Sequence, residues 1–343
     1  MANSVTYFGE QSQANVRTFQ SDNILLDVNK ITQLAFNETT NINFYTDEPI
    51  KIAMEHKGSK KQINTFVTIT FDADGMKEKG LSIFGPEKLN PFDRIVLDAI
   101  NTLFIEGKNR YMTLNMIYHV ITGSEDKTIS PQYAKEINNS ITKMMFTHIV
   151  IKADEEAIMY KKLKDFFYDS PILPAERMTS ILNGNEVACI HLLANPPLYV
   201  YANNKNQIAR VNIELMKLPF AKEKRETKNY LILAFYLLRR IIALGRTSNF
   251  IRYATLYHDL GYENESKQNK LTIRKRVKEI LNAWTNATFG RTKITGYEEI
   301  KQSGIPYEII IHFEFHKELE SALQTINYEN VIEAQTTTEN SKP

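Results

Sequence analysis

The chain has few of the residues that crosslink or break a fold. Its 343 residues include one cysteine, 13 glycines and 11 prolines. The single cysteine, Cys189, excludes a disulfide framework within the chain and any zinc site built on a cluster of cysteines. Such sparse use of cysteine is typical of a reducing compartment, so we expect a cytoplasmic protein.

Long apolar stretches are also missing. The sequence contains no run of about 18 uncharged apolar residues, and its first residues, MANSVTYFGEQSQANVR, lack the apolar core of a secretion signal. We therefore expect neither secretion nor a membrane partner. A composition of 43% apolar and 24% charged residues is that of a folded globular chain, and its length suggests about two domains.

Charge is unevenly distributed, although the formal net charge is only +2. The segment 217–293 carries 17 lysines and arginines against six acidic residues, and Lys267–Lys278 (KQNKLTIRKRVK) has six basic residues and no acidic one. The segment from Glu314 to the C-terminus has six acidic residues and two basic ones. Clustered basic side chains bind phosphates by releasing counterions, so the asymmetry favours a polyanionic partner. The alternative is a solvated helix face without a partner.

Three helices and two short strands are predicted between residues 90 and 151. Each helix starts at a capping residue and continues with apolar residues at helical spacing, and glycines end the first two helices. The signals in chain order are the cap Asn90-Pro91, the stop Gly107, the strand Arg110–Met112, the cap Thr113, the stop Gly123, the cap Ser130-Pro131 and the strand His148–Ile151. This is the order of a winged helix, a helix-turn-helix followed by a β-hairpin, whose third helix enters the DNA major groove.

The same order is predicted again about 135 residues later. Helices are expected at Glu226–Leu244, Tyr253–Leu260 and Lys270–Phe289, with a short connection at Asn249–Arg252 and hairpin strands at Thr292–Thr295 and Tyr307–Phe313 that turn through Gly304. The repeat is one of architecture rather than of identical residues.

The remaining segments are rich in predicted strands. They are Ile50–His56 and Ile63–Asp72, joined by the turn Lys57–Lys61, and then Val187–Leu193, Pro197–Ala202 and Gln207–Ile213, with a turn at Asn203-Asn204. The last three either extend the first wing or form a linking sheet.

These elements predict an α+β fold with two winged-helix domains, each a helix-turn-helix plus a β-hairpin wing, and an additional N-terminal β-rich segment. The expected organisation is a flexible arm at 1–22, the β-rich segment at 23–88, a first winged-helix domain with extended wing or linking strands at 89–220, a second, basic winged-helix domain at 221–316, and an acidic, partly disordered tail at 317–343.

Each third helix has a polar face opposite its apolar residues, and these faces supply the candidate DNA-binding residues. In the first unit they are Gln132, Lys135, Asn139 and Lys143. In the second they are Thr272, Lys275, Lys278 and Asn282, together with Arg274 and Arg276, which flank this face, and Lys270. Asn and Gln can bond adenine, Arg and Lys can bond guanine, and the others can hold phosphates. The alternative is a winged helix used for protein contact.

Two patterns are candidate catalytic signals. His258-Asp259 matches the doublet of metal-dependent phosphohydrolases, but no aspartate follows it and the nearest upstream histidine is distant. Asp72 and Asp74 can hold a divalent ion at a strand end, although no third acidic residue is identifiable from spacing.

A third pattern is the alternation of His312, Glu314 and His316, which places them on one strand face. Without a partner cluster they are better interpreted as the polar face of an edge strand. No phosphate-binding G-x-x-x-x-G-K-[ST] loop is present. We therefore expect no catalytic centre, no metal and no cofactor.

Four stretches carry a resemblance to a known family: KLNPFDRIVLDAINTLFIEGKN, YMTLNMIYHVITG, SPQYAKEINNSITKM and NPPLYVYANNKNQIARVNIELMKLP. They resemble replication initiators of plasmids and integrative elements in Gram-positive bacteria, and Leu89–Leu97 is similar to the first helix of tandem winged-helix plasmid initiators. The resemblance spans residues 85–315 approximately; the strands in 23–85 and the insert 152–220 are not standard parts of such proteins.

The resemblance implies a protein that binds repeated sites at an origin on double-stranded DNA and helps to open adjacent AT-rich DNA. It also implies host replication proteins as partners and, in some members, a homodimer that represses its own gene. Two other functions stay open at this point: a winged-helix transcriptional regulator, which needs the same groove contacts, and a metal-dependent nucleic-acid-processing enzyme that uses Asp72 and Asp74.

Overall fold

The computed structural model describes residues 23–36, 50–55, 64–81, 88–124, 128–159, 167–182, 185–220, 227–244, 249–289 and 292–315. It is a mixed helix-and-strand protein, which confirms the coarse α+β prediction. The predicted arm, the turn at 57–61, His316 and the acidic tail lie outside the described residues.

A first unit contains three helices and a three-stranded sheet. Its elements are α3 (Pro91–Ile105), β4 (Tyr111–Met112), α4 (Leu114–Thr122), α5 (Pro131–Phe146), β7 (Ala175–Leu182) and β8 (Asn185–Leu192). The strand order is β4-β8-β7, so the short strand between the first two helices pairs with the second strand of the hairpin.

Local capping explains where these helices start. The Asn90 side chain accepts hydrogen bonds from the backbone N–H groups of Phe92 and Asp93, Thr113 accepts one from Met116, and Ser130 accepts one from Tyr133. Gly123 ends α4 in a left-handed conformation, with φ at 68°. All three predicted caps are confirmed.

An excursion between α5 and β7 builds a second sheet with the N-terminal strands. β5 (Thr147–Lys152), α6 (Asp154–Met159) and β6 (Phe167–Pro171) follow α5, and β2 (Ile50–Glu55), β3 (Asn64–Phe71) and α2 (Ala73–Glu78) come from the N-terminal region. The sheet order is β2-β3-β5-β6, with antiparallel neighbours. The N-terminal strands are therefore completed by strands from the middle of the chain.

A second unit repeats the arrangement of the first. It comprises α9 (Lys228–Ala243), β10 (Phe250–Arg252), α10 (Tyr253–Asp259), α11 (Lys267–Trp284), β11 (Thr288–Phe289), β12 (Thr292–Gln302) and β13 (Ile305–Phe315). Its sheet has the order β10-β13-β12-β11, and again the strand after the first helix pairs with the second hairpin strand. The hairpin turns through Ser303 and Gly304, both with positive φ.

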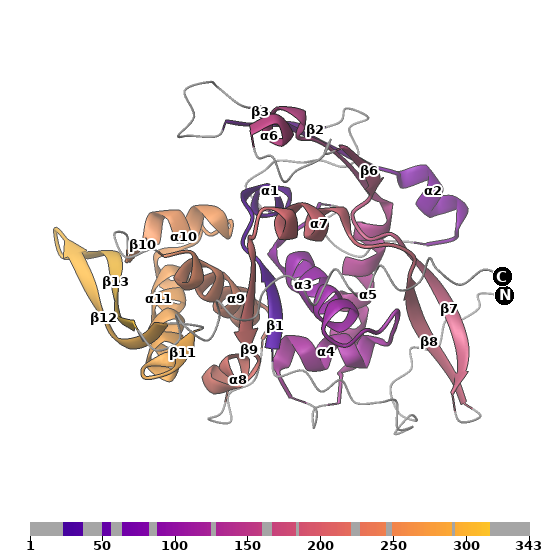
Figure 1. Ribbon diagram of the computed structural model, residues 1–343. Coiled ribbons are helices and arrows are strands. Elements are labelled where there is room, and N and C mark those ends of the chain that lie inside the picture. Colours follow the sequence, from indigo (N-terminus) through magenta and orange to yellow (C-terminus); the bar gives the residue numbers. More distant parts are fainter. Residues whose placement is uncertain are drawn as a thin grey trace.

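Short elements link the two units. β1 (Asn23–Asp27) pairs with β9 (Ile208–Asn212). α1 (Lys30–Ala35) and α7 (Pro197–Asn204) lie at one end of this pair, and α8 (Glu214–Lys217), which the 3-10 turn Leu218–Phe220 follows, lies at the other (Figure 1). The predicted strand at 197–202 is wrong, because these residues form α7. Its Tyr201 is fully buried and donates a hydrogen bond of 2.8 Å to the carboxylate of Glu156 on α6.

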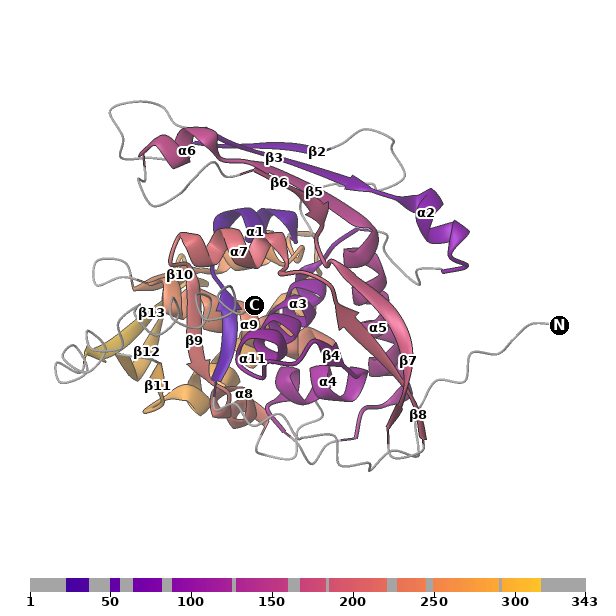
Figure 2. The ribbon, with the colours of Figure 1, turned by 45° about the vertical axis from the view of Figure 1, so that its right-hand side comes forward.

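The two hairpins project from opposite ends of the molecule (Figure 1). β7–β8 extends beyond α4 and α5, whereas β12–β13 extends beyond α10 and α11, and β1 and β9 lie between α3 and α9. The second view shows the β2-β3-β5-β6 sheet lying over α1 and α7 (Figure 2). Among the described residues, no helix combines the length and apolar character needed to cross a bilayer.

Buried charges join the two units at the contact between α3 and α9. Asp98 on α3 is 1% exposed and forms an ion pair with Arg239 on α9, whose side chain is 9% exposed. Arg94, one turn earlier on α3, donates a hydrogen bond of 2.5 Å to the backbone carbonyl of Asp27, and the Asp27 N–H donates one of 3.3 Å to Asp98. The same cluster thus holds β1, α3 and α9 together.

Arg239→Met is expected to lower the free energy of unfolding by about 3–5 kcal/mol, because it leaves the Asp98 carboxylate buried without its partner. The matched control is Arg210→Met: Arg210 pairs with Glu106 but has 65% of its side chain exposed, so its loss should cost less than about 1 kcal/mol. Denaturant unfolding measures both. Equal, small effects would show that the junction does not depend on this pair.

Asp27 should make stability depend on pH. Burial raises its pKa from 3.8 to about 7, with Asp98 adding to the rise and Arg94 opposing it. The folded state therefore keeps a proton that the unfolded chain has released, and this contribution to stability is lost as the pH rises through about 7. Relative to Asp27→Asn, the wild type should lose on the order of 3 kcal/mol between pH 5 and pH 8 in denaturant unfolding. A pH-independent difference between the two proteins would contradict this assignment.

Candidate nucleic-acid interface

Helix α11 buries one side and leaves the opposite side open. Ser266 caps it by accepting a hydrogen bond of 3.1 Å from the Asn269 N–H. Its buried residues recur at the three- and four-residue spacing of a helix: Ile273, Val277, Ile280, Leu281 and Trp284. The Trp284 ring N–H donates a bond of 2.8 Å to the backbone carbonyl of Leu215, which fixes the C-terminal end of α11 against α8.

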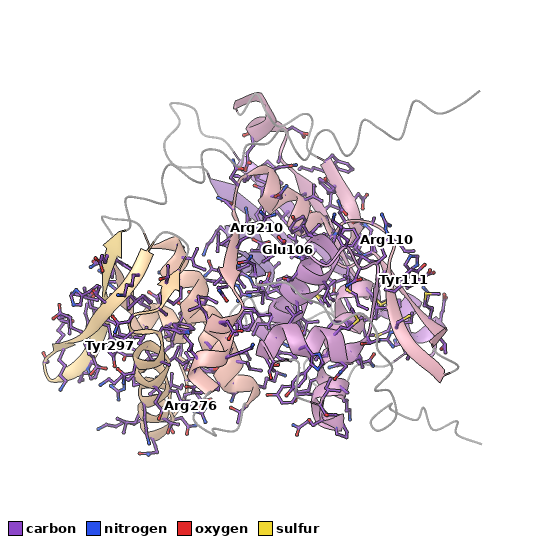
Figure 3. The ribbon with its side chains drawn as sticks, turned by 60° about the horizontal axis from the view of Figure 1, so that its bottom comes forward. Glu106, Arg110, Tyr111, Arg210, Arg276 and Tyr297 are labelled. Atoms are coloured by element: carbon purple, nitrogen blue, oxygen red, sulfur yellow. The ribbon has the colours of Figure 1, made fainter. Side chains whose placement is uncertain are left out.

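The predicted DNA-binding residues of α11 divide between the open side and its flanks. At 100° per residue, Lys275 lies opposite the centre of the buried side, and Lys275, Thr272 and Asn282 are all exposed. The flanking residues Lys270, Arg274, Arg276 and Lys278 are half-buried. Arg276 and the hairpin residue Tyr297 are both labelled in Figure 3, with Arg276 on the part of α11 turned away from the hairpin.

One flank of α11 is fixed to the hairpin by Glu299 on β12. The Lys278 ammonium lies 2.8 Å from one carboxylate oxygen of Glu299, and the Tyr253 hydroxyl donates a bond of 2.8 Å to the other. Burial alone would raise the pKa of Glu299, but these two hydrogen bonds and the charges of Lys278 and Arg274 together outweigh it and hold the pKa below 4.5. Next to this contact, the Tyr297 hydroxyl donates to the Asn282 side chain at 3.1 Å.

The N-terminal turns of α11 contact both α10 and the segment that follows α10. The Lys270 ammonium lies 5.4 Å from the centre of the Tyr257 ring and donates a hydrogen bond to the backbone carbonyl of Glu263. The Thr272 hydroxyl donates to the backbone carbonyl of Gln268 at 3.2 Å. These contacts leave Lys275 as the basic residue at the centre of the open side.

Helix α5 presents a smaller open face than α11. Gln132 and Lys135 are exposed and Asn139 is half-buried. Between them, Glu136 forms an ion pair of 2.8 Å with Lys228, the first residue of α9. This edge of α5 therefore faces the start of the second unit.

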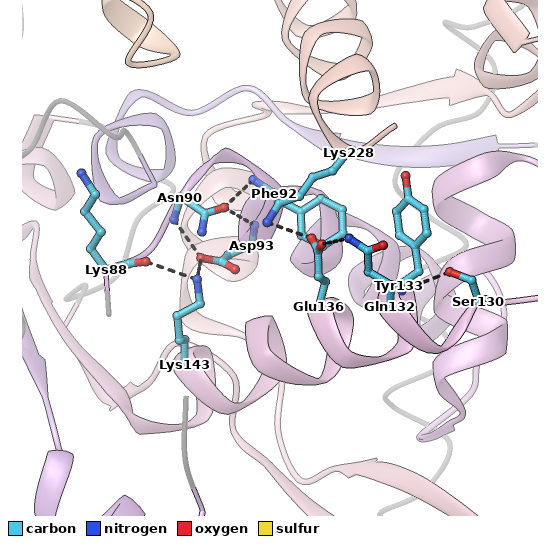
Figure 4. A network of polar contacts seen from close by, with 10 residues as sticks. All are labelled: Lys88, Asn90, Phe92, Asp93, Ser130, Gln132, Tyr133, Glu136, Lys143 and Lys228. Atoms are coloured by element: carbon cyan, nitrogen blue, oxygen red, sulfur yellow. Dashed lines mark hydrogen bonds and ion pairs between the residues drawn. The ribbon is translucent and has the colours of Figure 1, made fainter. Parts of the chain in front are cut away.

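Lys143 is buried, and its predicted place on the open face of α5 is wrong. Its side chain is 2% exposed and pairs with Asp93, which is 1% exposed, and its ammonium also donates a bond of 3.2 Å to the backbone carbonyl of Lys88 (Figure 4). The other Asp93 partner is the Asn90 N–H, at 2.8 Å. The start of α3 covers the last turns of α5, so this lysine cannot reach a phosphate in this conformation.

The sequence does not predict which hairpin residues contact the third helix of each unit. Tyr297 and Glu299 are two residues apart on β12, so they share the face turned toward α11. Their alternation is readable in the sequence, but only strand pairing shows which face the helix covers. In the first unit, Arg177 on β7 likewise donates to the backbone carbonyl of Asn138 on α5, at 3.2 Å.

The candidate catalytic residues are dispersed. The Asp72 side chain caps α2 by accepting a bond of 2.9 Å from the Gly75 N–H, and Asp74 is 92% exposed beside Lys77. Asp259 accepts hydrogen bonds from Tyr236, at 2.9 Å, and Gln33, at 3.2 Å. Within the described parts of the chain, no three His, Cys, Asp or Glu residues are grouped closely enough to hold a metal ion.

No protein-family model and no curated protein sequence matches the chain. Two crystal structures of domains 2 and 3 of RctB are similar to it in fold comparison. The first structure has a TM-score of 0.47 and 13% sequence identity, and the match covers 85% of this chain and 99% of that one. The second, of selenomethionine derivatives, has a TM-score of 0.43 and 13% identity, and the match covers 83% of this chain and 97% of that one. At these values neither family nor function follows from the likeness.

Lys143→Met should destabilise the protein by about 3–5 kcal/mol, because it leaves the Asp93 carboxylate buried without its cation. The matched control is Lys135→Met, a substitution at an exposed position of the same helix, which should change stability by no more than about 0.5 kcal/mol. Denaturant unfolding separates the two. If Lys143→Met keeps full stability and only weakens DNA binding, Lys143 belongs to the interface after all.

Proposed function

We propose that the chain is a double-stranded DNA-binding protein with two winged-helix units, which acts as a replication initiator without a catalytic centre. The topology supports the fold assignment. In each unit a helix, a short strand, two helices and a hairpin occur in this chain order, with β5, α6 and β6 inserted before the hairpin of the first unit and β11 before that of the second. In both units the short strand pairs with the second hairpin strand, as β4 with β8 and β10 with β13. This order and pairing are those expected of a helix-turn-helix with a wing.

The open side of α11 carries the proposal. It places Lys275 and Thr272 on the surface of a helix whose opposite side is buried, and Arg274, Arg276 and Lys278 border it. A helix of this width fits the major groove of B-DNA, where lysine and arginine contact phosphates and guanine edges. The hairpin beside it is fixed to Lys278 through Glu299, so helix and wing would meet the duplex as one body.

The two units would contribute differently to binding. The basic α11 would supply most of the phosphate contacts, and these depend on charge rather than on sequence. On α5, Gln132 and Asn139 carry amides, the groups that bond the edge of adenine. The first unit would therefore contribute relatively more to base reading than to affinity.

The proposed role in replication rests on the resemblance of the sequence to plasmid and integrative-element initiators. The protein would bind origin repeats in the cytoplasm. Its partners would be host replication proteins and, in a homodimer, a second copy of the chain. A transcriptional regulator would use the same groove contacts, so DNA binding alone does not separate the two functions. The decisive experiment joins the coding sequence and its flanking DNA to a plasmid that lacks an origin. Autonomous replication that disappears on deleting the coding sequence supports the initiator, and failure to replicate with intact operator binding favours the regulator.

Lys275→Ala should weaken binding to every duplex sequence, because it removes a cation that neutralises a phosphate. The slope of log affinity against log salt should become shallower by about 0.9 for each phosphate that the protein no longer neutralises. Lys77→Ala, on α2 at the far end of the molecule from α11 (Figure 1), is the matched control and should leave the slope unchanged. Fluorescence anisotropy on a mixed-sequence duplex over a salt series measures both. An unchanged slope for Lys275→Ala would remove α11 from the interface.

A further inference from the structure

The end of the β12–β13 hairpin carries an unusual apolar tip. Ile305 is 67% exposed, the highest exposure among the large apolar side chains that the structure describes, and Tyr307 is 37% exposed. Isolated apolar side chains on a surface are common and need no explanation. Three features of the hairpin distinguish this tip from such cases.

The hairpin bends directly before the tip. Ile300 pairs with Glu308 but Lys301 pairs with Pro306, so Tyr307 is an extra residue on its strand. Such a bulge bends the strand and changes the direction of nearby side chains, and bulges are frequent beside functional sites. The turn that follows uses left-handed backbone at Ser303 and Gly304. The exposed isoleucine is therefore held at the end of a bent, tight turn.

Cations flank the apolar tip. The Arg252 guanidinium lies 5.7 Å from the centre of the Tyr307 ring and is half-exposed, with Glu308 at 3.7 Å as its ion-pair partner. Lys301, on the strand opposite Pro306, is exposed. An apolar point between an arginine and a lysine matches the DNA minor groove, whose floor is formed by stacked bases and whose two walls carry phosphates.

The wing has a fixed position relative to α11. Glu299 joins β12 to Lys278 of α11 and to Tyr253 of α10. Three further residues, Ile300–Gln302, continue the strand beyond this contact, which corresponds to about 10 Å of extended chain. The hairpin projects past the helices in both ribbon views (Figures 1 and 2). The tip is therefore held beyond the helices, at a constant distance from the contact between the hairpin and α11.

We propose that Ile305 is an apolar wedge that enters the minor groove next to the major groove occupied by α11 and bends the duplex there. This inference rests on the proposed DNA-binding function. Isoleucine and similar side chains inserted between base steps partly unstack them and kink DNA by about 20–90°. Pyrimidine–purine steps such as TA and CA unstack most easily, so the wedge selects such a step without any hydrogen bond to a base. For a protein that opens an origin, local unstacking is the first deformation required.

The test begins with selection of binding sites from a random-sequence duplex library, using the full chain and its Ile305→Ser and Ile305→Leu variants. The wild type and Ile305→Leu should enrich a TA or CA step at a constant distance from the bases read in the major groove. Ile305→Ser should retain those bases and lose the preference for the step. Because position 305 is exposed, all three proteins should unfold at the same denaturant concentration.

Binding and bending of the selected duplex complete the test. Ile305→Ser should bind roughly tenfold more weakly, since it loses the burial of one apolar side chain. It should also bend the duplex less in a fluorescence energy-transfer assay, yet keep the wild-type salt slope, because every phosphate-binding cation is still in place. Unchanged bending and step preference in Ile305→Ser would overturn the wedge while leaving DNA binding in place. Absence of duplex binding by the wild type at low salt would overturn the proposed function, and the wedge with it.

Discussion

The ion pair between Asp98 and Arg239 sets the geometry of the two units. Moving two such charges out of water costs several kcal/mol for each ion, and only close pairing offsets that cost. Rotation of α9 on α3 would separate the charges and leave both buried and unpaired. The N-terminal strand β1 is part of the same arrangement, since Arg94 binds the Asp27 carbonyl. These charged groups therefore join α3, α9 and β1 in one arrangement, within a hydrophobic core that both units share.

The sequence predicts the ends of helices and hairpins correctly where residues close together in the chain determine them. Asn90, Thr113 and Ser130 start their helices because each side chain satisfies backbone N–H groups two or three residues away. The hairpin turn at Gly304 is equally local, because it requires a positive φ. These signals fix the ends of successive elements, and the order of the elements then predicts the twofold repeat of the architecture.

The wrong predictions concern residues whose structure depends on a contact with a residue far away in the sequence. The run from Leu198 to Tyr201 has the aromatic and branched residues of a strand, but it forms α7, and its Tyr201 hydroxyl binds Glu156. Lys143 has the spacing of an open-face residue, yet Asp93, 50 positions earlier, holds it in the interior. A helical wheel describes one helix by itself and contains no information about which neighbour covers its C-terminal turns. For the same reason, Glu299 could not be assigned to the α11 contact before the strand pairing was known.

Helices α5 and α11 are unequally exposed, so the two units would play different parts in recognising DNA. Only the first turns of α5 are open, whereas α11 is accessible around Lys275 and along to Asn282. In the proposed complex, binding by the second unit would hold the first at a high effective concentration over the neighbouring bases. Linked modules gain affinity of about 10²–10⁴ in this way without any new contact, provided that both can engage together. A small reading face on α5 is then sufficient for sequence preference, because α11 supplies the affinity and the Asp98–Arg239 contact supplies the alignment.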